Sequence, residues 1–282
     1  MSKIIALVKH KMYELTKSEK KVAQFVLENP NTVIKSTVNE LANMCNVSDA
    51  TVIRFVRKLN FETFQEFKFS IAKEETSDFN KEESELEIFQ NDLPEDILRK
   101  ITLSSLRTIE NTSKITNLEE YLKVAHAIRS ANKILIFGVG ASGAIVTFLQ
   151  YKLTRSGYPA VAIIDPHMQA ILAANLSSKD LAIGISQSGS TKDTVDSLAV
   201  AKSHGAITVA ITEHKNSPIA NYSSLIIEIY SSENPIKNSA GRSVLAQIFS
   251  IEILTGILQS LDFEKSYKAG EETAKAVVKK LY

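Results

Sequence analysis

The sequence has 282 residues, of which 44% are hydrophobic and 23% are charged, with one cysteine and no tryptophan. This length is typical of two domains, and the composition is that of a globular protein. A single cysteine excludes a disulfide framework and a cluster of thiolate metal ligands. The apolar runs are too short to span a bilayer, and we find no signal-peptide pattern, so we expect a cytoplasmic protein without membrane partners.

The net charge of +1 conceals three regions of different character. Residues 1–73 carry 12 basic and 7 acidic side chains, a net charge of +5. Residues 74–96 carry 1 basic and 10 acidic side chains, a net charge of −9, and the remainder carries 20 basic and 15 acidic side chains. This pattern predicts a basic domain over 1–74, an acidic linker over 75–96 and a larger body over 97–282.

Short helices with distinct ends are predicted in the basic domain. Apolar spacing predicts a helix over Lys17–Leu27, which Asn29-Pro30-Asn31 ends. A second helix is predicted over Thr37–Cys45, and a third begins at Ser48 as its cap and runs to about Leu59. Asn46 lies between them and tolerates the left-handed backbone of a tight turn.

The second and third of these helices have the layout of a helix-turn-helix. Ala42 is small where the two helices cross, and Val52 and Phe55 face back toward the core. The face that remains is the predicted DNA-binding face: Ser48, Asp49, Ala50, Thr51, Arg54, Arg57 and Lys58. The alternative is a three-helix bundle with a solvated basic face. Cys45 is expected to be a small core residue in either case.

Strands and helices alternate in the body after two helices, at about Glu95–Ser113 and Leu118–Ala131. The predicted strands are Lys133–Phe137, Val161–Ile164, Leu181–Ile185, Ala206–Ile211 and Leu225–Ile229. The predicted helices are Ala144–Arg155, Met168–Ala174, Asp193–His204, Ser217–Tyr222 and Ser243–Leu261. This alternation predicts a doubly wound parallel sheet with helices on both faces, so the fold class is α/β behind an all-helical N-terminal domain.

One loop carries the strongest functional signal in the body. The strand Leu181–Ile185 ends in hydroxyl groups and a glycine, and the Asp193 helix follows. Backbone N–H groups of such a loop and of the helix N-terminus favour an anion. The candidate ligand-binding residues here are Ser186, Gln187, Ser188, Gly189, Ser190 and Thr191. The pattern predicts a phosphate held without lysine or arginine, and hence a small phosphorylated metabolite.

A second loop, Gly138–Gly143, follows the first predicted strand and leaves three interpretations open. It fits G-x-G-x-x-G, and Asp165 at the end of the next strand supplies the acidic residue of a dinucleotide site. Ser142 places a hydroxyl at the helix start, however, and together with Gly140 and the Ser186–Thr191 loop it favours one phosphorylated sugar enclosed between both loops. The third interpretation is that these glycines and serines serve packing and turns only.

Together these residues resemble a known combination. The pairing of Thr37–Leu59 with the two loops resembles the RpiR/MurR family of bacterial transcription regulators, and the body resembles the sugar isomerase (SIS) domain. The two loops and Asp165-Pro166-His167-Met168-Gln169 are most similar to the HexR-like branch, which regulates central sugar metabolism. The resemblance implies that Ser142, Ser186, Ser188 and Thr191 hold the phosphate. It also implies dimerisation through the SIS body and N-terminal helices. The chain departs from the HexR-like pattern at Ser190, where a basic residue is usual.

Three further polar residues belong to the candidate site or its alternatives. His167 follows a strand end, where it could touch the sugar or serve the loop only, and Asp165 is expected to cap the Met168 helix. Arg242 could reach a ligand or lie on the surface. Catalysis would need a carboxylate paired with His167, for which Glu252 and Glu228 qualify by residue type only.

The sequence therefore predicts a DNA-binding transcription regulator that senses a phosphorylated sugar or sugar acid and controls carbohydrate-metabolism genes. Its expected partners are double-stranded operator DNA, the phosphosugar and further copies of itself in a homodimer or homotetramer. We expect no catalytic residues, no metal and no cofactor. The competing hypotheses are a phosphosugar isomerase that carries a helical domain and an NAD-dependent oxidoreductase.

Overall fold

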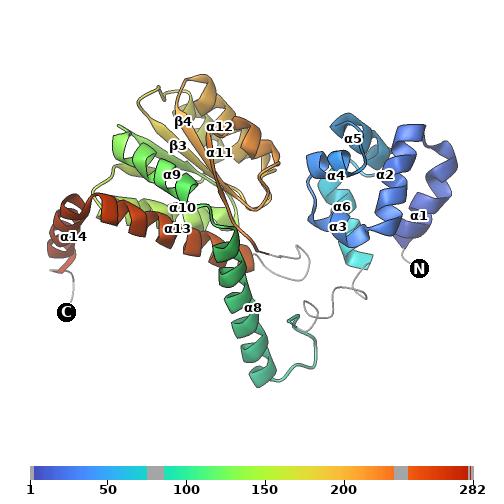
Figure 1. Cartoon of the computed structure of the whole chain (residues 1–282), viewed down its shortest axis with the longest axis horizontal. Helices are drawn as coiled ribbons and strands as arrows, with labels where there is room; N and C mark the ends of the chain where they lie inside the picture. Colours follow the sequence, from blue (N-terminus) through green and yellow to red (C-terminus); the bar gives the residue numbers. More distant parts are fainter. Residues whose placement is uncertain (1–2, 75–85, 232–240, 279, 281–282) are drawn as a thin grey trace. The chain divides into compact units, whose positions relative to one another are not determined.

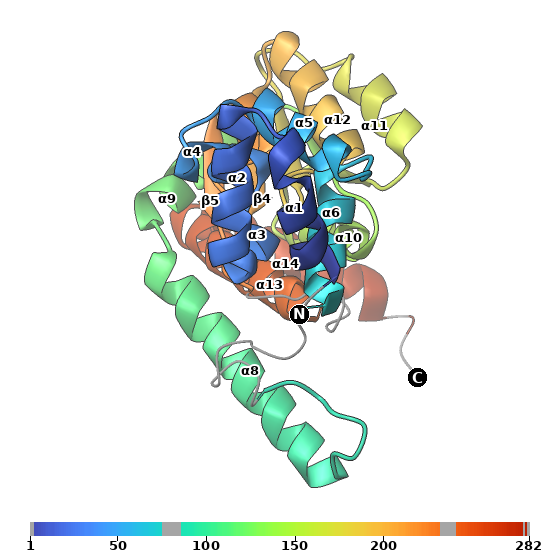
Figure 2. The same cartoon turned by 90° about the vertical axis from the view of Figure 1, so that its right-hand side faces the viewer.

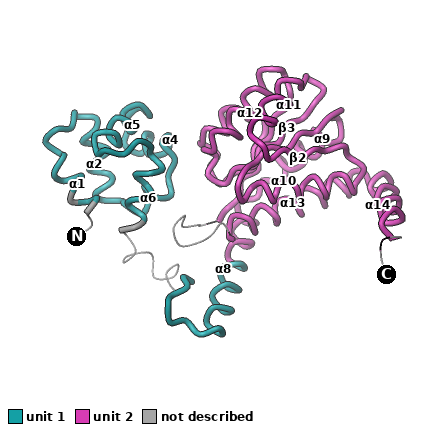
Figure 3. Tube along the Cα trace, turned by 180° about the vertical axis from the view of Figure 1, so that it is seen from behind, with its two compact units in different colours: residues 1–106, 233–239 teal, residues 107–232, 240–282 magenta. Residues whose placement is uncertain are grey.

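The computed structural model of the chain describes residues 3–74, 86–231, 241–278 and 280. These residues fall into two compact units, whose boundary lies between Leu106 and Arg107 (Figure 3). The first unit is helical, and the second contains a five-stranded sheet (Figure 1). The predicted fold class, a helical domain followed by a parallel α/β domain, is confirmed.

The helical unit holds most of the basic N-terminal sequence. Its segments are α1 (Lys3–Lys11), the 3-10 helix η1 (Met12–Glu14), α2 (Lys17–Glu28), α3 (Pro30–Lys35), α4 (Val38–Met44), α5 (Asp49–Lys58) and α6 (Phe64–Glu74). They share one core, in which fully buried side chains include Val22, Leu41, Val52, Phe55 and Phe67. The sequence pattern predicts α2, α4 and α5 within a few residues. It does not predict α3, because Pro30 starts a new helix where only the end of α2 was expected.

The turn between α4 and α5 confirms the expected role of Asn46. Its φ of 51° is left-handed, and it lets the Val47 N–H donate to the Ala42 carbonyl at 2.9 Å. Ser48 occupies the cap position of α5, but its hydroxyl lies 3.0 Å from the Thr51 hydroxyl and makes no cap bond to the backbone. Cys45 lies in the core as predicted, and burial raises the pKa of its thiol to about 11.

The second unit is built on a parallel sheet of order β2-β1-β3-β4-β5. Its strands are β1 (Ile134–Phe137), β2 (Ala160–Ile163), β3 (Leu181–Ile185), β4 (Ile207–Thr212) and β5 (Leu225–Glu228). Its helices are α8 (Pro94–Ile115), which crosses the unit boundary, α9 (Leu118–Ser130), α10 (Ala141–Arg155), α11 (Pro166–Ala173), α12 (Lys192–Ser203), the 3-10 helix η2 (Pro218–Tyr222), α13 (Gly241–Leu261) and α14 (Phe263–Val278).

Side chains alternate between the two faces of this sheet, and helices cover both (Figures 1 and 2). One face packs against α9, α10 and α13 through Ile136, Ile183 and Val209. The other packs against α11 and α12 through Leu135, Ala182 and Ala210. Helices on both faces are the reason that the strands are continuous apolar runs instead of alternating ones.

The closing helix of the fold is α13, and a further helix follows it. The expectation that every apolar run is too short to span a bilayer is wrong for α13, which is long and apolar enough by length and composition. In this unit, however, Ala246, Leu254 and Leu258 of α13 belong to the core. α14 was not predicted. It begins directly after Asp262, whose carboxylate binds Arg129 at 2.6 Å and Tyr158 at 2.5 Å.

The predicted acidic linker is only partly within the described residues. Residues 75–85 lie outside them. From Leu86 to Leu93 the chain forms turns, where the Asp92 carboxylate pairs with Lys100 at 2.6 Å, and α8 then begins within the predicted linker. The domain limits at 74 and 96 therefore stay predictions, and the boundary between the compact units lies further along, within α8.

Glu19 links α2 to α5 inside the helical unit. Its side chain is only 2% exposed and accepts hydrogen bonds from the Thr16 backbone N–H at 2.7 Å and from Lys58 Nζ at 2.8 Å. Burial raises the pKa of Glu19, but the hydrogen bonds from Lys58 and Thr16 outweigh burial, and the net pKa is lowered. The fold therefore stabilises the charged form of this carboxyl.

We predict that Glu19→Gln lowers the free energy of unfolding by about 1 kcal/mol at pH 7, because the acceptor loses its charge. A carboxyl with a lowered pKa contributes stability above its unfolded pKa and loses it as the pH falls through the folded pKa. The difference from the parent protein should therefore shrink below about pH 4.

Urea denaturation of the full chain at pH 7 and pH 3 measures this difference. Glu14→Gln is the matched control, because Glu14 is an exposed carboxylate paired with Lys11. A difference at pH 3 as large as that at pH 7 would contradict the prediction.

Candidate functional site

The candidate site lies at the carboxyl edge of the sheet, where the strand order reverses. β1 pairs with β2 on one side and with β3 on the other, all in parallel. Ligands of open α/β sheets bind at such a point. The loops after β1 and β3 therefore leave neighbouring strands at the same edge, as predicted. Gly138 approaches this neighbour closely, because a Cβ there would lie 3.2 Å from the Ile185 carbonyl oxygen.

Hydrogen bonds between residues of the loop after β3 hold it in a tight turn. The Ser186 side chain is buried, and its hydroxyl lies 3.0 Å from that of Thr191. Gly189 has a φ of 61°, and a Cβ there would lie 1.9 Å from Ser217 Oγ, so that only glycine fits. Ser188 Oγ accepts a hydrogen bond from the Ser190 backbone N–H at 3.3 Å, which leaves its own proton for another acceptor.

Two helices begin at this edge with open first turns. Thr191 is the cap residue of α12, and Gly140, with a φ of 58°, is the cap residue of α10; neither makes a side-chain cap bond. The first N–H groups of a helix have no partner within the helix, and the helix dipole adds partial positive charge there. Ser142 lies in the first turn of α10, half-buried, instead of within the loop. The edge therefore offers N–H and O–H donors from both loops.

α11 shows which roles the Asp165–Gln169 segment has in the fold. Asp165 caps α11, as predicted, by accepting the Met168 backbone N–H at 2.8 Å. His167 is exposed in the first turn, and its ligand contact stays a prediction. Gln169 is fully buried and donates to the carbonyls of Ile163 at 2.8 Å and Gly138 at 3.3 Å, so that it braces the first loop.

The sequence did not point to a polar group beside Gln187. Gln187 Nε2 donates to Glu213 Oε2 at 2.6 Å, and the same oxygen accepts the Ser231 hydroxyl at 2.6 Å. Glu213 follows β4 and Ser231 follows β5 after a few residues. The sequence did contain a signal for this group: both residues come shortly after parallel strands, and the carboxyl ends of such strands meet at one edge of the sheet. The remaining predicted ligand residue, Arg242, lies half-buried in the first turn of α13.

The two carboxylates considered for catalysis have other partners. Glu252 pairs with Lys152 at 2.8 Å between α13 and α10, and Glu228 lies 3.6 Å from Lys215. Neither pairing brings a carboxylate to His167. Within the part of the chain that the structure describes, His, Cys, Asp and Glu side chains form no group that could hold a metal ion.

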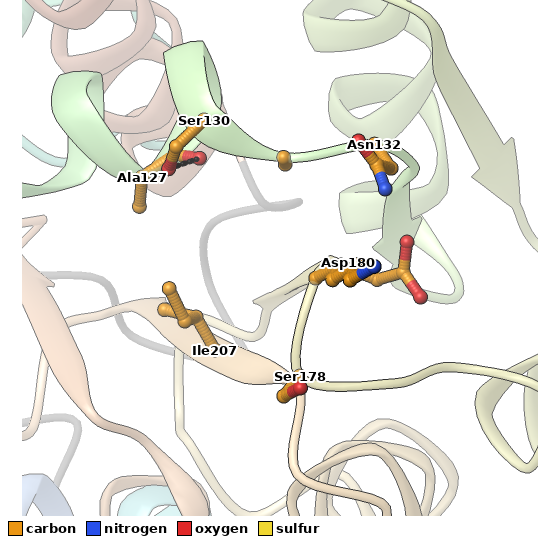
Figure 4. A pocket seen from close by; sticks show the side chains of 8 residues that line it. Ala127, Ser130, Asn132, Ser178, Asp180 and Ile207 are labelled. Atoms are coloured by element: carbon orange, nitrogen blue, oxygen red, sulfur yellow. Dashed lines mark hydrogen bonds between the residues drawn. The ribbon is translucent and has the colours of Figure 1, made fainter.

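A separate cavity of 330 Å³ lies at the opposite, amino-terminal edge of the sheet (Figure 4). It is lined by the end of α9 and by the segments that lead into β1, β3 and β4, including Ser130, Asn132 and Asp180. Its polar groups serve the fold: the Asn132 N–H donates to the Lys179 carbonyl at 2.9 Å, and the Asp180 carboxylate accepts the Ser177 N–H and hydroxyl. We therefore assign the candidate site to the carboxyl edge.

In the helical unit, α5 presents most of the predicted DNA-binding face to solvent. The exposed members are Ser48, Asp49, Ala50, Arg54, Arg57 and Lys58. Thr51 is the exception, because its side chain is 4% exposed and its hydroxyl accepts from Arg54 at 3.2 Å. Lys58 is exposed, but its ammonium donates to Glu19 and to the Glu14 carbonyl. Arg57 lies on the same exposed face.

These two units define the class of protein: a helix-turn-helix DNA-binding unit joined to a doubly wound α/β unit. Residues 2–78 match the family described as "Helix-turn-helix domain, rpiR family", and residues 127–256 match the SIS domain. The chain belongs to the rpiR family of transcriptional regulators that carry a SIS domain.

Relatives along most of the chain agree with this assignment. An uncharacterized HTH-type transcriptional regulator of Caldanaerobacter subterraneus is 36% identical over 254 residues, which are 90% of this chain and 89% of the relative. Another from Haemophilus influenzae is 32% identical and covers 86% of this chain and 85% of its own. These matches do not single out the HexR-like branch.

A solved structure shares the fold over the whole length. The Vibrio vulnificus NanR protein complexed with ManNAc-6P superposes with a TM-score of 0.88 at 24% identity and covers 99% of each chain. The sugar isomerase domain of an RpiR transcription factor from Sphaerobacter thermophilus has a TM-score of 0.59 at 23% identity, over 64% of this chain and 98% of that domain. At these identities the similarity concerns the fold.

We predict that Arg57 and Lys58 differ in their effects. Arg57→Ala should weaken binding to duplex DNA from upstream of its own gene about five- to tenfold and reduce the salt slope by about one, because one phosphate contact is lost. Lys58→Met should weaken DNA binding and should also lower the free energy of unfolding, because it leaves the buried Glu19 carboxylate without its ammonium partner.

Fluorescence anisotropy at several salt concentrations and thermal unfolding measure the two effects. Lys20→Ala, at an exposed lysine of α2, is the control. Unchanged DNA affinity in Arg57→Ala, or unchanged stability in Lys58→Met, would contradict the corresponding assignment.

Proposed function

We propose that this regulator binds a phosphorylated sugar at the carboxyl edge of its SIS sheet and that binding changes its affinity for operator DNA. The phosphate would be held by Ser186, Ser188, Thr191 and Ser142, with Gly140, Gln187, Gly189 and Ser190 shaping the loops. His167 and Arg242 would face the sugar. The genes under control would serve carbohydrate metabolism.

The observation that carries the proposal is the convergence of donors at the reversal of strand order. β1 and β3 are neighbours, and each is followed by a helix whose N-terminus has no side-chain cap. The hydroxyl pair of Ser186 and Thr191 lies in the loop after β3. A phosphate dianion accepts many hydrogen bonds and is favoured at a helix N-terminus. Binding by neutral donors suits a sensor, because the ligand can leave as its concentration falls.

The structural neighbour suggests the first ligands to test. NanR was solved with ManNAc-6P and shares the fold of this chain. An N-acetylhexosamine 6-phosphate is therefore the first probe, followed by hexose phosphates, pentose phosphates and phosphorylated sugar acids. A thermal-shift screen of this panel, followed by calorimetry, tests the proposal. If no member of the panel binds, the proposal fails.

The competing function is a phosphosugar isomerase. Isomerisation of a sugar phosphate needs a base to move a proton, and the carboxylates considered for this role pair with lysines instead. Turnover of the ligand that binds, measured on the purified protein, would decide for an enzyme. For the oxidoreductase hypothesis, Asp165 would have to hold a ribose, but it caps α11.

The response to ligand requires two states of different ligand affinity. We propose a cytoplasmic homodimer or homotetramer in which two α5 helices read half-sites about one helical turn or a multiple apart. The ligand can change this spacing only if it binds the two arrangements with different free energies. Whether the ligand releases or tightens DNA binding is a direct outcome of the DNA-binding assay.

We predict that the double variant Ser186→Ala/Ser188→Ala binds the ligand on the order of a hundredfold or more weakly, because hydrogen bonds to a charged acceptor contribute about 1.5–3 kcal/mol each. DNA binding without ligand should persist, because both residues lie in the SIS domain. The variant should behave as a regulator fixed in its ligand-free state.

Calorimetry with the ligand found in the screen measures the loss. Ser203→Ala, at the far end of α12, is the matched control, because its hydroxyl bonds to the helix carbonyl of Val200. Undiminished ligand affinity in the double variant would refute the assignment. Loss of ligand-free DNA binding would mean that the loop has a structural role.

A further inference from the structure

A chain of hydrogen bonds connects the Ser186–Thr191 loop with α8. It begins at Gln187, whose backbone carbonyl accepts the Glu213 N–H at 3.0 Å and whose side chain donates to the Glu213 carboxylate at 2.6 Å. The Thr212 hydroxyl donates to the same carbonyl at 3.2 Å. Gln187 is thus held to the end of β4 by three bonds, so that a shift of the loop displaces Glu213.

The second link joins β4 to the end of β5. The Glu213 carboxylate accepts the Ser231 hydroxyl at 2.6 Å and the Ser231 backbone N–H at 3.2 Å. Ser231 is fully buried. A carboxylate binds its hydrogen-bond donors more strongly than a neutral oxygen does. Ser231 therefore follows the position of Glu213.

The third link joins β5 to α8. The Thr112 hydroxyl donates to the Tyr230 carbonyl at 3.0 Å and accepts the Tyr230 N–H at 3.2 Å. Tyr230 lies just beyond β5, the edge strand of the sheet, and Thr112 bonds to both its backbone N–H and its carbonyl. Thr112 is fully buried, and Tyr230 precedes Ser231 directly. Movement of Ser231 is therefore passed to α8.

α8 is the helix through which such a movement can leave the second compact unit, called the SIS unit because it contains the matched SIS domain. It is continuous from Pro94 to Ile115 and crosses the boundary between the two compact units. Thr112 lies in the part of α8 that belongs to the SIS unit. A helix is a rigid element, along which a change at Thr112 would be carried toward residues 94–106.

We propose that Thr112 is the positioning residue through which the state of the Ser186–Thr191 loop is transmitted to α8, by way of Gln187, Glu213 and Ser231. The inference rests on the proposed function for the identity of the natural signal. The coupling itself is a property of the fold and is testable without a ligand.

Hydrogen exchange of the full chain tests the coupling directly. Glu213→Gln weakens the bonds to Ser231 while it preserves size, and it should speed amide exchange at residues 107–115 by roughly five- to tenfold. In a Thr112→Val background the same substitution should cause no further change, whereas in a Thr112→Ser background, which keeps the hydroxyl, it should act as in the parent protein.

Two outcomes would overturn the proposal: no change at residues 107–115 in Glu213→Gln, or the same change in the Thr112→Val background. If Glu213→Gln does not fold, Ser231→Ala interrupts the same link and is read in the same way. Thr102→Val is the matched control on α8, because the Thr102 hydroxyl bonds to its own helix at the Leu98 carbonyl.

The second arm uses the phosphosugar identified by the screen, with N-acetylmannosamine 6-phosphate as first probe. The affinity of Thr112→Val for this ligand, and its affinity for DNA in the absence of ligand, should lie within about twofold of the parent protein's. The change in DNA affinity that the ligand causes should be lost in Thr112→Val and retained in Thr112→Ser and Thr102→Val.

A full ligand response in Thr112→Val would contradict transmission through this hydroxyl. If no phosphosugar binds the parent protein, the proposed function fails, while the exchange experiment still decides the coupling.

Discussion

The adjacency of β1 and β3 is the constraint on which the site depends. Because the chain goes from β1 to the edge strand β2 and returns to β3 on the other side, two helices start at neighbouring positions of one sheet edge. Neither loop alone would surround a phosphate. The pairing of Phe137 with Gly184 in the parallel register brings the two loops together at one edge.

Local chemistry made much of this arrangement predictable. The left-handed turn at Asn46 and the apolar strands depend on residues that are close in the sequence. The structure confirms this turn, the strands and the parallel sheet. The resemblance to a regulator family with a SIS domain also agrees with the relatives. What the Ser186–Thr191 loop binds remains a prediction, although its geometry is compatible with a phosphate.

The features that the sequence did not predict depend on contacts between distant residues. Lys58 was assigned to DNA from its position on one helix, whereas its partner Glu19 lies 39 residues away. Glu213 and Ser231 are ordinary polar residues until the strand order brings them to Gln187. α14 was missed because the residue before it, Asp262, has its partners Arg129 and Tyr158 far away in the sequence, Tyr158 at a separation of 104 residues.

The chemistry available at the carboxyl edge depends on what its polar side chains already bind. In this chain the carboxylate of Glu213, which follows β4, accepts hydrogen bonds from Gln187 and Ser231. A base for proton transfer needs a free lone pair directed at the substrate. Glu213 instead joins Gln187 to Ser231 and so connects the Ser186–Thr191 loop with the ends of β4 and β5.

The single buried cysteine has a practical consequence for labelling the protein. Only the thiolate reacts with maleimide or nitroxide labels, and a thiol with a pKa of about 11 is almost wholly protonated at neutral pH. Cysteines introduced at exposed positions of α5 or α8 should therefore react faster than the buried Cys45. Since the chain also has no tryptophan, a single introduced indole would report without background fluorescence. Such labels would report on α5 and α8 in the full chain as candidate ligands and DNA are added.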